Sequence, residues 1–367
     1  MSSPRQRFLD YVRRVPGARP VVSPFLPHRP LVDKTLEHMG LPSDGDHFEN
    51  ESRLARELGY EPMFMCGGSD LIFPWREDES LSDAEWSVAV LDTPEGEWVR
   101  TVSRQKGMFG DETGFPVKTE ADHRKLQAVC DRIRDQEEAI RAYFRDCRQR
   151  AGDEGVIVIG HPHVTWLGYQ IGQQNMIYHA MDYPEAYAAS MEAIFRASLV
   201  LFEYAMDEGV DFMSESGYGM EMISPAQFAA QDMPYTRRLS DWVHERGGLM
   251  WYHNCGQTRK LIEAKYFDGL GCDVIETLAP PPDGDNHDLA ASRRCLDPAI
   301  CSKGNLDLSL LRTGSVEEIA RTTREMVRAV EGYHHIHSTA DTPFAETPVE
   351  NFLAFVTTAR DEADRLA

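Results

Sequence analysis

The sequence lacks any long run of apolar residues. Its first twenty residues, MSSPRQRFLDYVRRVPGARP, contain no apolar stretch as long as that of a signal peptide. No later segment reaches the roughly 20 apolar residues that a membrane-spanning helix needs. We therefore expect no membrane as a partner, and a cytoplasmic location.

Positive charge is also scarce. Lys and Arg number 38 against 60 Asp and Glu, which gives a formal net charge of -22. Such a surface repels the phosphates of nucleic acids and of anionic lipids, so neither is an expected partner. The charge favours solubility and says little about a substrate, because the local field of a cleft can oppose the global one.

The cysteines show no disulfide pattern, and the common nucleotide-binding motifs are absent from the sequence. The seven cysteines are an odd number scattered along 367 residues, which argues against a disulfide framework. No G-x-G-x-x-G follows the first predicted strand and no Walker sequence is present, so the usual nucleotide-binding folds lack their phosphate loops. Neither a disulfide framework nor one of these nucleotide-binding folds is therefore expected.

Short apolar runs alternate with longer amphipathic stretches, which is the pattern of parallel strands joined by helices. The eight predicted strands are Val21 to Pro27, Pro62 to Gly67, Val156 to Gly160, Val210 to Ser216, Gly248 to Cys255, Val274 to Leu278, Ala299 to Asn305 and Tyr333 to Ser338. The clearest predicted helices are Tyr183 to Glu208, Ser224 to Arg246, Ser315 to Val330 and Thr347 to Leu366. Eight such strands predict an α/β fold of the (β/α)8 TIM-barrel type.

One segment departs from the alternation of strands and helices. The stretch from Trp86 to Val102 has two alternating arms around a Pro-Glu-Gly turn, which predicts a β-hairpin between the second and third barrel strands. A helical region near residues 119 to 150 follows it. We interpret the hairpin as an excursion from the barrel and predict a single domain over residues 1–367.

The fifth predicted strand ends in Trp251-Tyr-His253-Asn-Cys255-Gly256. Side chains two apart on a strand face the same way, so His253 and Cys255 project together. Imidazole and thiolate groups are zinc ligands, and active sites of barrels lie at the C-terminal ends of strands. A packed histidine beside a buried cysteine is the alternative interpretation of this short motif.

The eighth strand supplies a candidate third ligand. Asp341 follows Tyr333-His-His-Ile-His-Ser-Thr-Ala at the predicted top of the barrel, where it could be a metal ligand or a general base. Capping of the next turn is an equally good interpretation of this aspartate. His161 and His163, at the end of the third strand, could bind an anionic group, transfer protons or pack against Trp166.

Two further strand ends carry polar residues. Glu215 ends the fourth strand and is the candidate second carboxylate near the metal, and Tyr218 stands between two glycines in a loop shaped to approach a ligand. Asn305 and Asp307 end the seventh strand, where they could orient a substrate or support the metal ligands.

From about Met213 onward the chain resembles the uroporphyrinogen decarboxylase superfamily. The motifs that carry the resemblance are Ile223-Ser-Pro-Ala-Gln-Phe228 with Met233-Pro-Tyr235, His253-Asn-Cys255-Gly256, Gly304-Asn-Leu-Asp307 with Gly314-Ser-Val-Glu-Glu-Ile319, and Glu346-Thr-Pro-Val-Glu-Asn351. The hairpin turn Leu91-Asp-Thr-Pro-Glu-Gly96 is similar to one in many members. The resemblance implies a (β/α)8 barrel and an enzyme.

Within that superfamily the resemblance implies one of two chemistries. True uroporphyrinogen decarboxylases hold the substrate carboxylates with an R-Q-A-G-R segment, and the segment from Pro24 to Pro30 is no equivalent. The cobamide-dependent methyltransferases hold zinc through H-x-C and a distant cysteine. His253 and Cys255 match the first two ligands. The cysteine expected as third ligand falls at Asp341 or directly next to it, and this chain has no cysteine there.

We therefore expect a zinc-dependent methyltransferase that acts with a corrinoid (cobamide-carrying) partner protein or a methylated small molecule. Zinc on His253, Cys255 and Asp341 would activate a thiol or hydroxyl acceptor. Two alternatives stay open: a metal-free decarboxylase of a carboxylated small molecule, and a non-catalytic barrel that binds a corrinoid or another ligand. An exposed flank of the barrel could pair two copies as a homodimer.

Overall fold

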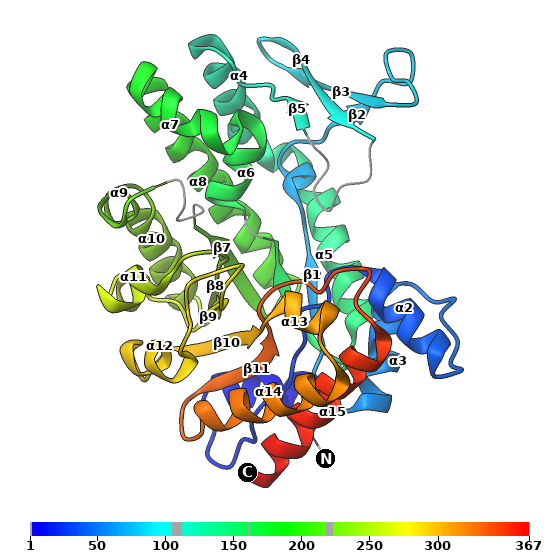
Figure 1. Cartoon of the computed structure of the whole chain (residues 1–367). Coiled ribbons are helices and arrows are strands. Elements are labelled where there is room, and N and C mark those ends of the chain that lie inside the picture. Colours follow the sequence, from blue (N-terminus) through cyan, green and yellow to red (C-terminus); the bar gives the residue numbers. More distant parts are fainter. Residues whose placement is uncertain (1, 105–111, 161, 218–222, 367) are drawn as a thin grey trace. The chain divides into compact units, whose positions relative to one another are not determined.

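The computed structural model describes residues 2–104, 112–160, 162–217 and 223–366 (Figure 1). The chain forms two compact units, one of Met1–Cys66, Arg145–Ile159 and Gly209–Ala367, the other of Gly67–Phe144 and Gly160–Glu208. The single domain expected over residues 1–367 stays a prediction. No helix in the described part of the chain is long and apolar enough to cross a membrane.

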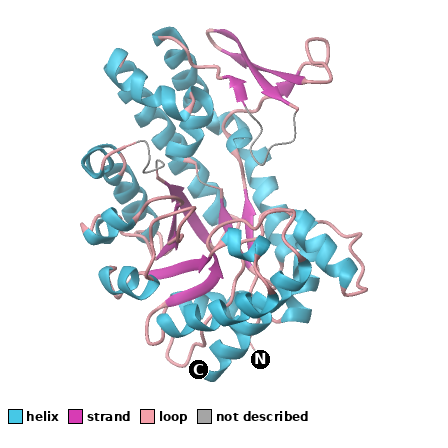
Figure 2. Cartoon of the chain, viewed as in Figure 1, coloured by secondary structure: helices cyan, strands magenta, loops and turns pink. Residues whose placement is uncertain are grey.

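A curled, parallel, seven-stranded sheet forms the centre of the first unit (Figure 2). Its strands, in spatial order, are β1 (Met63–Cys66), β6 (Val156–Ile159), β7 (Phe212–Ser216), β8 (Leu249–Asn254), β9 (Val274–Thr277), β10 (Cys301–Leu306) and β11 (His335–Thr339). The α/β class and the order of seven predicted strands are thus confirmed. The architecture is TIM-barrel-like.

The closed barrel of eight strands was a wrong expectation. The run from Val21 to Pro27 makes a single β-bridge, from Val22 to His337 of β11, and is otherwise not a strand. Hydrogen bonds from Ser23 N to His337 O and from Glu61 N to Val22 O, both 2.9 Å, hold it between β11 and the residues before β1. Pro24 and Pro27 have no N–H to donate, so a longer ladder cannot form here.

Helices cover the outer side of this sheet (Figure 2). They are α2 (Arg29–His38), α3 (His47–Leu58), α9 (Pro225–Gln231), α10 (Met233–His244), α11 (Arg259–Glu263), α12 (Leu289–Cys295), α13 (Leu308–Thr313), α14 (Val316–Ala329) and α15 (Val349–Leu366), with a 3-10 turn at Phe267–Gly269. The first helix, α1 (Pro4–Val12), lies instead at one end of the sheet. The single helix predicted from Ser224 to Arg246 is two helices. Pro234 explains the break, because proline fits the first turn of a helix but not its interior.

The main core of the first unit lies on the inner side of the sheet. Alternate strand residues such as Phe212, Trp251 and Val274 point inward, and α1 closes one end of the sheet with Phe8 and Leu9. The Phe8 ring lies 5.9 Å from that of Phe212 and 6.3 Å from that of Trp251. This apolar packing holds the strands in the register that positions their other ends.

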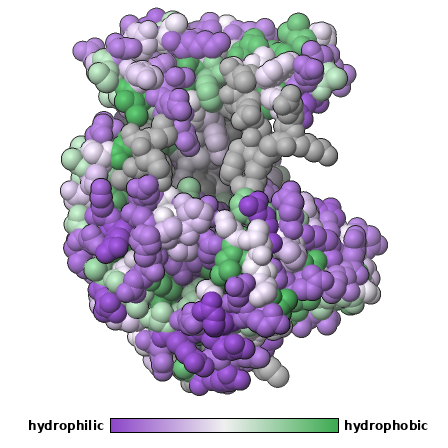
Figure 3. Space-filling view, viewed as in Figure 1, coloured by the Kyte–Doolittle hydropathy of each residue, from purple (hydrophilic) through white to green (hydrophobic). Residues whose placement is uncertain are grey.

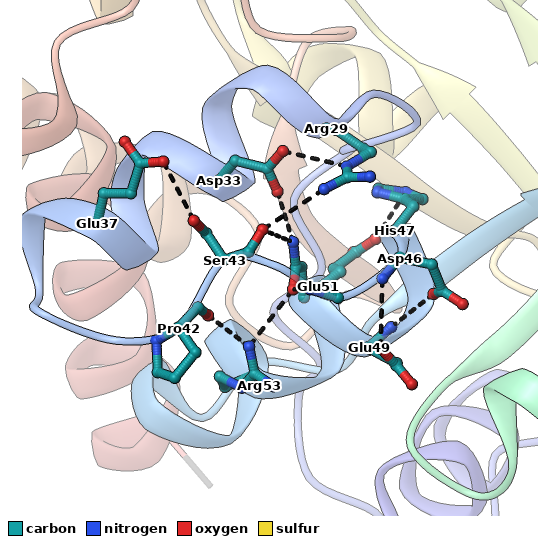
Figure 4. A network of polar contacts seen from close by, with 12 residues as sticks. Arg29, Asp33, Glu37, Pro42, Ser43, Asp46, His47, Glu49, Glu51 and Arg53 are labelled. Atoms are coloured by element: carbon teal, nitrogen blue, oxygen red, sulfur yellow. Dashed lines mark hydrogen bonds and ion pairs between the residues drawn. The ribbon is translucent and has the colours of Figure 1, made fainter.

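The outer helices follow the usual amphipathic rule. A capping box of Ser315 and Glu318 starts α14, which buries Ile319 and Val327. Its solvent side is hydrophilic (Figure 3). The bend between α2 and α3 is tied by Asn50 Nδ2, which donates to Asp33 Oδ1 (2.7 Å) and to the carbonyl of Ser43 (2.8 Å) (Figure 4).

The second unit combines an antiparallel sheet with helices. The sheet has the order β2 (Arg76–Glu77), β3 (Trp86–Thr93), β4 (Gly96–Ser103) and β5 (Glu112–Gly114). The helices are α4 (Glu120–Asp131), α6 (His163–Ile171), α7 (Gln173–Asp182) and α8 (Pro184–Asp207), with 3-10 turns at Ser69–Leu71 and Ile133–Gln136, while α5 (Glu137–Ala151) runs from this unit into the other. The predicted hairpin is confirmed as β3 and β4, joined at Thr93 and Gly96.

Candidate metal centre

Strand β8 delivers two metal-binding side chains at its C-terminal end. His253 is the fifth residue of β8 and Cys255 follows the strand directly. Gly256 then turns the chain with a φ of 82°, a conformation that glycine adopts without strain. The His253 side chain is 13% exposed and Cys255 is exposed, so both are within reach of a ligand from solution.

Asp341 joins these two residues from the loop after β11. One ligand atom from each of His253, Cys255 and Asp341 lies within 4.8 Å of the other two, and a search of the described residues finds no second such group. His253 Nε2 is 3.9 Å from Asp341 Oδ2. Imidazole nitrogen, thiolate sulfur and carboxylate oxygen are the three protein ligands of zinc, so the residues fit such an ion.

A buried ion pair lies behind His253. The side chain of Glu276 on β9 receives a 3.1 Å hydrogen bond at Oε1 from His253 Nδ1, and Lys303 Nζ on β10 donates to its Oε2 at 2.7 Å. Both Glu276 and Lys303 have side chains only 1% exposed. With Nδ1 bound to a carboxylate, Nε2 faces Asp341, which is the arrangement that orients metal-ligating histidines in many proteins.

The row from His253 to Lys303 follows from strand register. In the parallel ladder His253 pairs with Glu276, and Glu276 pairs in turn with Lys303. Three paired residues project from the same face of a sheet, so the imidazole, the carboxylate and the ammonium lie side by side. The Lys303 ammonium also lies 4.8 Å from the centre of the Phe25 ring.

Neighbouring charges shift the pKa values of His253 and Glu276. Burial by itself would lower the pKa of His253, but Cys255, Glu276 and Asp341 outweigh it and raise that pKa well above its ordinary value. Burial would raise the pKa of Glu276, yet Lys303 and His253 hold it well below its usual range. Without a metal ion, these neighbours therefore favour the protonated form of His253.

Further carboxylates lie close to Asp341. Burial and then the charges of Asp307 and Asp341 raise the pKa of Asp283, while Arg312 opposes the shift. Asp307 caps α13 by accepting from Leu310 N through Oδ1, and its Oδ2 has no hydrogen-bond partner among the described residues. This concentration of negative charge favours a cation over an anion.

The other predicted site residues are placed less directly. Asn305 is buried on β10, and its side-chain amide donates to the Leu278 carbonyl at 2.9 Å. Glu215 is not brought to the three donors, because it pairs with Tyr252 in the ladder and so faces away from His253. Its Oε1 accepts from Ser216 N at 3.0 Å.

Of the two predicted histidines of strand three and the loop tyrosine, the structure describes His163. His163 belongs to the second unit, where it begins α6, is fully buried and contacts the Met191 carbonyl at 3.3 Å through Nε2. His161 and Tyr218 lie outside the described residues. Glu276 and Lys303 were missed, although ionisable residues inside two apolar strands were a usable signal, since such residues are buried almost only as pairs.

Comparisons with known proteins agree with this architecture. The family model described as Uroporphyrinogen decarboxylase (URO-D) matches residues 114–362. A uroporphyrinogen decarboxylase from Trichodesmium erythraeum is 24% identical over 266 residues, which are 69% of this chain and 70% of that protein. The solved structure of a methyltransferase from Methanosarcina mazei has a TM-score of 0.69 at 14% identity, covering 98% of this chain and 99% of that one, which is a likeness of fold.

Proposed function

This chain belongs to the uroporphyrinogen decarboxylase family, and from that premise we propose that it is a zinc-dependent methyltransferase. The donor of the methyl group would be a corrinoid protein or a methylated small molecule, and the acceptor a thiol or hydroxyl. The observation that carries the proposal is the convergence of His253, Cys255 and Asp341, with ligand atoms within 4.8 Å of one another, in front of a buried carboxylate.

Different residues would bind the ion, orient its histidine ligand and orient the acceptor. His253, Cys255 and Asp341 would hold the ion, and zinc supplies Lewis acidity that favours the anionic form of an acceptor near neutral pH. Glu276 keeps the His253 ring in one orientation, and Lys303 keeps Glu276 ionised. Asn305 and Asp307 stand nearby on β10 and at the start of α13 as candidates for orienting the acceptor.

Roles for the remaining predicted residues belong to the same proposal. His161 or His163 would position the methyl donor, Tyr218 would contact the substrate, and Glu215 would act as a base. Asp341 is the better supported of these residues, because its carboxylate belongs to the group of three that could hold the ion.

Decarboxylation is the second candidate, and the match to the family model favours it. The charges near the centre weigh against a substrate with several carboxylates. The charges of Asp307 and Asp341 both act on Asp283, and Lys303, the buried cation behind the centre, is already paired with Glu276. A polyanion entering there would meet like charges, which cost several kcal/mol when desolvated.

An assay of both reactions with one protein preparation tests the proposal. We expect demethylation of methylcobalamin with 2-mercaptoethanol as acceptor, abolished by 1,10-phenanthroline and restored by zinc. The matched assay follows carbon dioxide release from uroporphyrinogen. Chelator-insensitive release of carbon dioxide without methyl transfer would overturn the proposal in favour of decarboxylation.

Zinc affinity is expected to rise with pH. The pKa of His253 is raised, so the imidazolium persists to a higher pH than in a free histidine, and the ion must displace its proton in order to bind. Each displaced proton makes the apparent affinity rise about tenfold per pH unit below that pKa. Competition with a fluorescent chelator between pH 6 and pH 8 measures this slope, and a flat profile would contradict it.

A further inference from the structure

A cavity lies at the opposite end of the sheet from the metal centre. Its volume is about 500 Å³, and it is lined by the end of α1, the residues before β10 and the residues before β11. We call it the basal pocket; its polar lining comes from Tyr11, Arg14, Arg293, Tyr333 and His334. All of these residues belong to the first unit, near the two chain ends (Figure 1).

Two guanidinium groups line the basal pocket without a carboxylate partner. Neither Arg14 nor Arg293 makes an ion pair with any described residue, in a chain where 60 acidic residues face 38 basic ones. Arg14 Nε donates a 3.1 Å hydrogen bond to His334 Nδ1. Its two terminal nitrogens have no hydrogen-bond partner among the described residues. Arginine carries its charge at every accessible pH, so both positive charges are permanent.

Arg293 is the more unusual of the two. It is 1% exposed, and its guanidinium donates only to backbone carbonyls, of which the Ile300 oxygen is closest at 2.7 Å. Its Nε is buried and has no partner. The other fully buried cation of the described chain, Lys303, is paired with Glu276, whereas Arg293 lacks the anion that a buried charge requires.

The two arginines also act on each other. Burial lowers the pKa of Arg293, and the charge of Arg14 also lowers it, while Cys301, Tyr11 and Tyr333 act in the opposite direction. An anion between them would relieve this repulsion and supply acceptors for the unpaired N–H groups. His334, which accepts from Arg14, cannot do so, because burial lowers its pKa to about 4 and it donates through Nε2 to the Tyr11 carbonyl.

The rim of the basal pocket is apolar. Val15, Tyr333 and Leu366 line it and are 43%, 37% and 37% exposed, which makes them three of the ten exposed large hydrophobic residues of the described chain. Such residues usually lie singly on a surface, and their grouping around one cavity marks a contact surface. A ligand here would place an anionic group inward and an apolar part at the rim.

The backbone conformation of Arg14 is also unusual. Arg14 has a φ of 56° and ends α1 as the left-handed residue, with hydrogen bonds from Arg14 N to Tyr11 O and from Val15 N to Asp10 O. Glycine is the usual residue at this position of a helix end. Arg14, which lines the pocket, therefore occupies a backbone position where glycine would be less strained.

We propose that the basal pocket binds a small organic anion, a carboxylate or phosphate monoester that carries an apolar chain. The anionic group contacts Arg14 and Arg293, and the chain lies against Val15, Tyr333 and Leu366. This site is separate from the metal centre and does not depend on the proposed methyl transfer.

Calorimetry with the full chain tests the proposal. The probes are octanoate, octyl phosphate, the neutral octanamide and inorganic phosphate. We expect octanoate or octyl phosphate to bind at least about tenfold more tightly than both octanamide and inorganic phosphate. Octanamide binding as tightly as octanoate would overturn the anionic part of the proposal, and inorganic phosphate binding as tightly as octyl phosphate would overturn the apolar part.

Arg14→Gly separates binding from folding. Glycine suits the left-handed position, so the variant should melt at the same temperature as the unchanged protein or higher, while its affinity for the bound probe falls at least about tenfold. Arg13→Ala is the matched control, because Arg13 is an exposed arginine beside the pocket that does not line it. Equal losses of affinity in the two variants, or no binding of any probe, would overturn the proposal.

Discussion

Replacing both His253 and Cys255 with alanine is expected to remove zinc from the purified protein. The unchanged chain should carry about one zinc ion, and the double variant less than about one tenth of that, because Asp341 alone cannot hold the ion. Methyl transfer to the thiol acceptor should fall with the metal content. Elemental analysis after dialysis against a weak chelator measures the first effect, and the methylcobalamin assay measures the second.

Cys295→Ala serves as the control for this loss. Cys295 is a half-buried cysteine at the end of α12 and is not part of the group that could hold the ion, so its replacement removes a thiol and leaves the centre intact. Its zinc content should equal that of the unchanged protein. Equal, negligible zinc in the unchanged protein and in the double variant would remove the proposed mechanism.

Most of the fold could be predicted from local pattern. Seven strands were predicted because apolar runs between helices are a local signal, and the hairpin because its arms alternate around a turn. The closure of the barrel could not be predicted this way. The run from Val21 to Pro27 is as apolar as a buried strand, but Pro24 and Pro27 interrupt its hydrogen bonding, and only the bridge at Val22 forms.

The candidate site, too, could be predicted only in the part that depends on local sequence. His253 and Cys255 are two residues apart on one strand, so local geometry predicts that they face together. The support of His253 by Glu276 and Lys303 depends on the register of three strands whose paired residues are more than 20 positions apart in sequence. Sequence pattern does not set that register, because packing between distant segments does. The facing of Glu215 depends in the same way on the register of β7 with β8.

Glu276→Gln is expected to have the second largest effect, on stability and on metal binding together. The substitution leaves the Lys303 ammonium, 1% exposed, without its negative partner, and breaking a buried pair from one side costs about 3–5 kcal/mol of unfolding free energy. It also removes the carboxylate that orients His253, a loss that lowers metal affinity by about 10–100-fold. Urea unfolding in the presence of a chelator measures the stability alone, since bound metal would add to it.

The double variant Glu276→Gln/Lys303→Met separates these two roles. Removing the ammonium as well eliminates the uncompensated charge, so most of the lost unfolding free energy should return. Zinc affinity should stay low, because the His253 ring still lacks its carboxylate. If the double variant regained full zinc affinity, Glu276 would act only as the counter-ion of Lys303. The orientation of His253 would then have to come from its remaining neighbours, of which Asp341 approaches the other ring nitrogen, Nε2.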